Sequence, residues 1–144
     1  MAVSYLKLER VAPIGDVYAV EANDVLIFDT VVSNDGLIEY DTEQGIITFH
    51  EAGFYYVDWF VAPQFGLTTD GSNWAIQTTK SELSIIGSSH TKVSVTTGFA
   101  ILEAEAEETA KLVNVSDGAI SLSQAVQTKA SLVVYNVAVM SIVP

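Results

Sequence analysis

Apolar and polar residues alternate along much of this chain with a period of two, which is typical of β-strands. The clearest stretch runs from Gly53 to Val61 between Ala52 and Pro63, and it is rich in β-branched and aromatic residues. Both of its rows of side chains are apolar apart from Asp58, whereas a sheet with one solvated face would leave one row polar. We therefore expect a second sheet of the same chain to cover one face and a second copy of the chain to cover the other.

Shorter strands are expected on both sides of this stretch, separated by turns about ten residues apart. The strongest turn signal is Asn34-Asp35-Gly36, because Asn and Gly adopt positive φ at low cost. Gly98 interrupts one strand, where a bulge or a close backbone approach is expected. The other expected strands are residues 1–10, 37–40, 46–49, 74–80, 91–102, 111–115, 120–122 and 131–139, with shorter apolar pieces at 17–20, 25–28 and 83–86.

Two segments between these strands are expected to be irregular. Residues 63–73 are predicted to form a loop, and Glu103–Glu108 is predicted to be a strand end followed by a turn, because its acidic residues fall at alternate positions. No amphipathic helix is apparent. About ten short strands at regular spacing predict an all-β sandwich or barrel.

Composition adds a reason to expect association. Of 144 residues, 49% are hydrophobic and only 17% are charged, and the mean hydropathy is +0.35. A small monomer cannot hide so much apolar surface. The longest uncharged apolar run, residues 130–144, is shorter than the roughly 18 residues of a spanning helix, and nothing near Met1 resembles a signal peptide. We therefore expect self-association and no membrane insertion.

Charge and cysteine content exclude several functions. The formal net charge is −12, so phosphate backbones and anionic membranes are repelled and nucleic acid is not an expected partner. The absence of cysteine excludes disulfides, thiolate metal sites and cysteine nucleophiles. Divalent cations and basic partners remain open.

The residues that could support catalysis are not arranged as a known active site. His50 and His90 lie far apart in the sequence and lack the local spacing of a zinc site. A Ser-His-Asp triad could be assembled from Ser88 or Ser89, His90 and a nearby Asp, but the chain has no Gly-x-Ser-x-Gly nucleophile motif. We therefore expect a protein that is not an enzyme and has no cofactor.

Acidic residues near the first hairpin could in principle bind calcium through hard oxygen ligands. They are Asp35, Glu39, Asp41 and Glu43, and Asp70, Ser72 and Asn73 form a weaker group. Neither group has the spacing of a calcium-binding loop, so a solvated acidic rim is favoured and no metal site is predicted.

Asn114, Trp59 and Trp74 are candidate sites for glycosylation or ligand contact. Asn114-Val115-Ser116 matches the N-glycosylation sequon, but it lies inside an expected strand, where such a match arises often by chance. Trp59 and Trp74 are expected to be core or interface anchors. Trp74 follows a polar loop and is the better candidate for a ligand surface.

Glycines, aromatics and strand residues recur in a spaced pattern from about Val17 to Val139. The pattern consists of Gly45-Ile46-Ile47-Thr48-Phe49, Ala52-Gly53-Phe54-Tyr55-Tyr56-Val57, Thr97-Gly98-Phe99-Ala100-Ile101-Leu102, Leu112-Val113-Asn114-Val115-Ser116 and Lys129-Ala130-Ser131-Leu132-Val133-Val134. It resembles the globular head of complement C1q and its tumour necrosis factor (TNF) relatives. It is most similar to the C-terminal heads of bacterial collagen-like exosporium glycoproteins of the BclA type.

The resemblance implies one head domain over residues 1–144, folded as an all-β, ten-stranded jelly-roll sandwich and assembled as a homotrimer. It also implies an extracellular or spore-surface location. No Gly-X-Y stretch precedes the head, so a collagen-like stalk would lie upstream of Met1. The expected trimer-interface residues are Phe54, Tyr56, Asp58, Trp59, Phe60, Phe99, Ile101 and Tyr135.

Asp58 is the charged member of this set, and two roles are open. It could form part of an axial ion or anchoring site, or a Tyr, Thr or Lys could satisfy it across a subunit contact, which is favoured. The expected function is a structural or adhesive tip of a surface filament. The alternative is a carbohydrate- or receptor-binding tip such as a phage fibre head, with a host-surface or glycan ligand. A small β-sandwich hydrolase is a third interpretation and is disfavoured.

Overall fold

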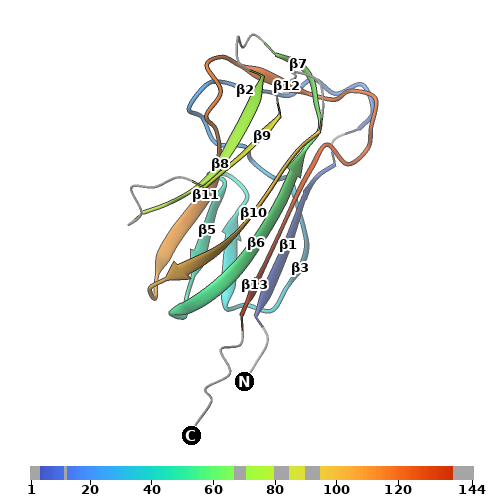
Figure 1. Cartoon of the computed structure of the whole chain (residues 1–144). Helices are drawn as coiled ribbons and strands as arrows, with labels where there is room; N and C mark the ends of the chain where they lie inside the picture. Colours follow the sequence, from blue (N-terminus) through green and yellow to red (C-terminus); the bar gives the residue numbers. More distant parts are fainter. Residues whose placement is uncertain (1–3, 12, 67–70, 80–84, 90–94, 138–144) are drawn as a thin grey trace, which may run out of the picture.

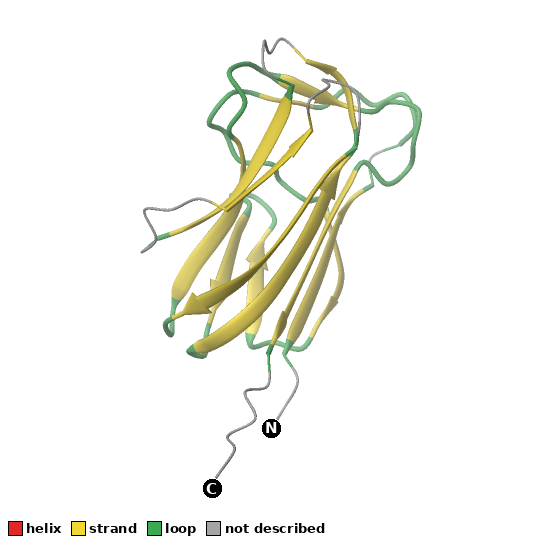
Figure 2. Ribbon diagram, in the orientation of Figure 1, coloured by secondary structure: helices red, strands yellow, loops and turns green. Residues whose placement is uncertain are grey.

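The computed structural model describes residues 4–11, 13–66, 71–79, 85–89 and 95–137. These residues form thirteen β-strands and no helix (Figure 2). The strands are β1 (Tyr5–Arg10), β2 (Ala19–Val20), β3 (Thr30–Asn34), β4 (Ile38–Asp41), β5 (Ile46–Phe49), β6 (Gly53–Val61), β7 (Pro63–Gly66), β8 (Ser72–Thr78), β9 (Ile85–Ser89), β10 (Thr96–Ala104), β11 (Glu108–Asn114), β12 (Ile120–Leu122) and β13 (Ala130–Asn136).

The strands build two five-stranded sheets that face each other (Figure 1). One sheet has the order β10-β6-β13-β1-β3 and the other β4-β5-β11-β8-β9, and neighbouring strands are antiparallel. A small sheet of order β2-β12-β7 lies at one end of the sandwich. At the opposite end β1 begins beside the end of β13, with Tyr5 opposite Tyr135. The all-β sandwich expected from the sequence is confirmed.

The hydrophobic core lies between the two large sheets. Alternate residues of β6 point into it, because successive side chains of a strand lie on opposite faces: Tyr55, Val57, Trp59 and Val61 are all buried. The facing sheet contributes Phe49, Trp74 and Leu112, among others. The rings of Phe49 and Tyr55 have centroids 4.5 Å apart.

Two glycines allow the edge strands β9 and β10 to approach closely. A Cβ at Gly98 would lie 2.2 Å from Cζ2 of Trp59, its directly opposite residue on β6. A Cβ at Gly87 would lie 2.3 Å from the carbonyl oxygen of Thr97. Real side chains do not tolerate such distances, so both positions require glycine as packed. The close approach expected at Gly98 is confirmed, and the pairing of β10 with β6 continues past it without a bulge.

Several strands differ from the expectation. The count of ten is not confirmed, since thirteen strands form within the described residues. β3 was not expected, and β7 lies in what was expected to be a loop. The apolar residues 25–28 do not form one of the thirteen strands, although the Leu26 N–H donates to the Leu112 carbonyl at 2.8 Å. The turn expected within Glu103–Glu108 is confirmed, because β10 ends at Ala104 and β11 begins at Glu108.

Candidate functional site

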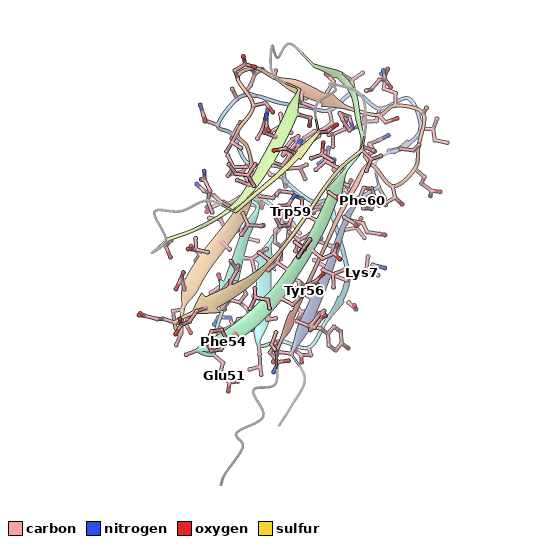
Figure 3. The ribbon with its side chains drawn as sticks, in the orientation of Figure 1. Lys7, Glu51, Phe54, Tyr56, Trp59 and Phe60 are labelled. Atoms are coloured by element: carbon pink, nitrogen blue, oxygen red, sulfur yellow. The ribbon has the colours of Figure 1, made fainter. Side chains whose placement is uncertain are left out.

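The outer surface of the β10-β6-β13-β1-β3 sheet carries most of the residues expected at an interface. On β6, the side chains that alternate with the core residues point outward. Strand pairing then aligns outward residues of neighbouring strands: Ile101, Tyr56, Tyr135 and Tyr5 in one row, and Phe99, Asp58, Val133 and Lys7 in the next. We call Tyr5, Lys7, Phe54, Tyr56, Asp58, Phe60, Phe99, Ile101, Val133 and Tyr135 the open face (Figure 3).

The open face is apolar and exposed in the isolated protomer. Phe99 is 73% exposed and Ile101 62%, while Tyr5, Phe54 and Tyr135 are each 41% exposed. Monomeric soluble proteins rarely expose contiguous apolar patches of more than a few hundred Å². The sequence predicted that both faces of β6 need cover, and the protomer covers only the face that carries Trp59 and its neighbours.

The polar groups of the open face lie next to its aromatic rings. The rings of Tyr56 and Tyr135 are 5.1 Å apart between centroids. Partial burial raises the pKa of the Tyr56 hydroxyl, and the negative charge of Asp58 and the neighbouring Tyr135 raise it further. Asp58 itself is exposed in the protomer, and its carboxylate accepts a hydrogen bond from the Tyr56 hydroxyl while its remaining acceptor positions face solvent.

Two of the predicted site residues are buried inside the protomer. Trp59 is 1% exposed and belongs to the core, so of the two places expected for it, core and interface, it lies in the core and not on the open face. Trp74 is fully buried on β8, and its indole N–H donates to Ser72 Oγ at 2.9 Å, so it is a core anchor, as favoured, and the candidate ligand surface at Trp74 is wrong. The strand begins two residues before Trp74, and the polar loop that suggested exposure ends earlier than expected.

The acidic residues near the first hairpin are used locally. Asp41 Oδ1 accepts hydrogen bonds from the N–H groups of Glu43 and Gln44 at 2.8 and 3.1 Å, which fixes the turn between β4 and β5. Glu39 contacts His50. Within the described residues no group of three His, Cys, Asp or Glu side chains could hold a metal ion. Asp70, from the weaker group, lies outside the described residues.

His50 connects three parts of the chain through two carboxylates. Its Nε2 lies 3.0 Å from Glu39 Oε2 on β4, and its Nδ1 lies 3.1 Å from Glu107 Oε1 in the β10–β11 turn. Hydrogen bonds to Glu107 and then to Glu39 raise the pKa of the His50 imidazole above its ordinary value of 6.5. Both ring nitrogens face acceptors, so the protonated form is the one this arrangement favours.

Protein stability is expected to fall slightly as pH rises through the folded-state pKa of His50. Because that pKa is raised, the stabilisation is fully present below the unfolded value near 6.5 and is lost above the folded value. The effect is small, since the three side chains are partly exposed and solvent screens them. Thermal melts of wild type and His50→Gln between about pH 6 and pH 9 test this, and parallel pH profiles would contradict it.

The candidate triad is only partly described. Ser88 Oγ donates a hydrogen bond to Asn73 Oδ1 at 2.6 Å and thereby links β9 to β8. His90 lies outside the described residues, so the triad remains untested.

The sequon residue Asn114 has a structural role in the fold. It is fully buried, and its amide nitrogen donates to the carbonyls of Val20 and Gly118 at 2.9 and 3.0 Å. Its side-chain oxygen accepts from the Ser116 N–H at 2.9 Å. The amide therefore has no room for a glycan in the folded protomer, and it connects β11 to β2 and to the following turn.

Comparison with solved structures shows that this two-sheet fold is similar to the jelly-roll heads of C1q and TNF proteins. The globular domain of zebrafish complement 1qA is similar over 92% of this chain and 94% of its own, with a TM-score of 0.61 and 14% identity. Eiger TNF from S. frugiperda is similar over 96% of this chain and 94% of its own, with a TM-score of 0.59 and 14% identity. The PRD1 vertex protein P5 is similar over 94% of this chain and 97% of its own, with a TM-score of 0.62 and 13% identity.

These likenesses concern the fold alone, because the identities are low. No family model and no curated protein sequence matches the chain. The described residues contain no helix that could cross a membrane.

Proposed function

We propose that this chain is a non-enzymatic, homotrimeric head domain whose protomers pack through the open face. The observation that carries the proposal is the contiguous apolar surface on β10, β6, β13 and β1, which the protomer leaves exposed. Burial of apolar surface stabilises an interface by roughly 25 cal/mol per Å² before the costs of association. The C1q- and TNF-like fold supports a threefold assembly, which the sequence resemblance also implies.

The finer role we propose is the terminal head of an extracellular, collagen-like surface filament, with a bacterial spore surface as the setting. The first residue of β1 and the last residues of β13 lie at one end of the sandwich, and the small β2-β12-β7 sheet lies at the other (Figure 1). A stalk joined at the first end would leave the small sheet as the outward tip. The tip would serve structure or adhesion.

The non-enzymatic assignment is supported by how the candidate polar residues are used. Ser88 bonds to Asn73, Asp41 fixes a turn, and Glu39 contacts His50. Each of these groups has a structural partner within the protomer.

A second candidate is the tip of a virus or phage particle that binds a receptor or a glycan. Its support is the likeness to a protein that is described as a vertex protein, PRD1 P5. Since Trp74 is buried, a glycan would have to use the outward tip or another exposed surface. Binding on a glycan array by the intact assembly would favour this candidate over a purely structural head.

Size-exclusion chromatography with light scattering tests the proposed assembly. We expect a mass of about three times the 15.5 kDa of one chain at micromolar protein concentration. The mass of a single chain under these conditions would contradict the proposal, because the open face would then be stable in water.

A further inference from the structure

Two opposite charges lie within the open face. Lys7 on β1 and Asp58 on β6 are in the same cross-strand row, with Val133 of β13 directly between them. Other acidic residues on this side of the sheet, Glu9 and Glu103, lie in different rows of the paired strands. The row shared by Lys7, which Figure 3 labels, and Asp58 therefore contains one cation and one anion, whereas Glu9 lies in the row of Phe60 and Glu103 in the row of Phe54.

Lys7 has no ion pair within the described part of the protomer. The ion pairs there join Arg10 to Asp29 and His50 to Glu39 and Glu107. Lys7 and Asp58 are two strand spacings apart, roughly 9–10 Å between backbones, with Val133 filling the space between them. Lys7 is consequently available to a group outside the protomer, and the exposed Asp58 carboxylate, which hydrogen-bonds the Tyr56 hydroxyl, keeps further acceptor positions for such a group.

The other described cations are not available to the open face. Arg10 pairs with Asp29, and its guanidinium stacks 3.7 Å from the ring centroid of Tyr18. Lys129 is fully buried, with Nζ donating to the carbonyls of Ser123 and Val126 at 2.6 and 2.9 Å. Lys111 is exposed on β11, which belongs to the opposite sheet.

A second copy of this chain is the occupant that fits both charges. The formal net charge of −12 makes copies repel one another, and a cation of one copy that meets an anion of the next offsets part of this repulsion at the contact. Covering the face would remove water from Lys7 and Asp58, and a charge buried without a partner is strongly unfavourable. Because every copy carries both charges on the same face, one contact type repeated around a ring pairs Lys7 and Asp58 of every copy.

We propose that Lys7 of one protomer pairs with Asp58 of its neighbour, and that this pair fixes the register of the assembly. The inference rests on the proposed function, because it requires the open face to be the contact between copies. The pair contributes specificity more than affinity: apolar burial stabilises the contact, and the charges reject alignments in which like charges meet.

Charge reversal tests the pair. We expect Lys7→Glu and Asp58→Lys each to raise the protomer concentration at which the assembly half-dissociates by at least about tenfold. The double variant Lys7→Glu/Asp58→Lys restores the pair with reversed polarity and should recover most of that loss. Lys111→Glu makes the same change of net charge as Lys7→Glu on the opposite sheet and should leave dissociation within about twofold of wild type.

The outcomes separate this inference from the proposed function. If wild type and Lys111→Glu are trimeric but the double variant is as weak as the single variants, the pair does not exist and the trimeric head stands. If the single variants dissociate no more readily than wild type, the pair is likewise excluded. A monomeric wild type overturns both. Circular dichroism melts of all variants should match wild-type protomer stability, since both side chains are exposed in the protomer.

Discussion

Replacing Gly98 with valine is expected to destabilise the protomer by roughly 3 kcal/mol or more, and to leave little folded protein. The new Cβ would lie 2.2, 2.5 and 2.8 Å from three ring carbons of Trp59. Trp59 is 1% exposed and packed between the sheets, so its ring cannot move away without disturbing the core. The Gly98 backbone also lies close to the opposite sheet, since a Cβ at Gly87 would lie 2.9 Å from Gly98 Cα.

Chemical denaturation of matched variants measures this effect. Gly53→Ala is the control, because a Cβ there meets nothing nearer than 4.0 Å, and we expect its stability to be within about 0.5 kcal/mol of wild type. Gly98→Ala should cost about 1–3 kcal/mol in the wild-type background. The same change should cost much less when Trp59→Leu has removed the large ring. Equal costs in the two backgrounds would show that the Gly98–Trp59 contact does not limit the substitution.

Replacing Ile101 with aspartate is expected to convert the assembly into folded protomers. Ile101 is 62% exposed in the protomer, so the change costs the isolated fold little. In an assembly packed through the open face, it places an unpaired carboxylate in a dry contact, in the same row as Tyr56 and Tyr135. We expect the protomer concentration at half-dissociation to rise by about a hundredfold or more.

Light scattering and circular dichroism on the same samples distinguish dissociation from unfolding. Ile14→Asp is the matched control, because Ile14 is 70% exposed but lies in the loop after β1, away from the open face. It should keep the mass and the melting temperature of the wild-type assembly. A trimeric, fully folded Ile101→Asp variant would place the contact between copies on another surface.

Local patterns predicted much of the fold. The bounds of β6 and β12 and the hairpin of β4 with β5 agree with the sequence, because turn residues mark their ends and alternation marks their interiors. β3 was not predicted from the sequence. Its last residue is also the first residue of the turn signal Asn34-Asp35-Gly36, so no separate boundary marks the end of a strand there. β7 is short and paired only with β12, more than fifty residues later in the chain, a contact that local sequence does not contain.

The candidate site was predicted in part. The sequence showed that both rows of β6 are apolar but could not show which row points inward. That choice depends on packing between distant strands, such as the contact of Trp59 on β6 with Gly98 on β10, which local sequence does not contain. Trp74 was misjudged for a similar reason, since the burial of a strand depends on what packs over it from distant parts of the chain.

The alignment of Tyr5 with Tyr135 has a practical consequence for engineering the molecule. These residues sit on adjacent strands, so their backbones are only about 5 Å apart. A few glycines could join them covalently, and new ends could be opened in an exposed turn such as the one at Gly36. Foreign peptides inserted at that turn or fused beside Tyr5 would leave the sandwich at the same end, because β3 and β4 meet beside the start of β1.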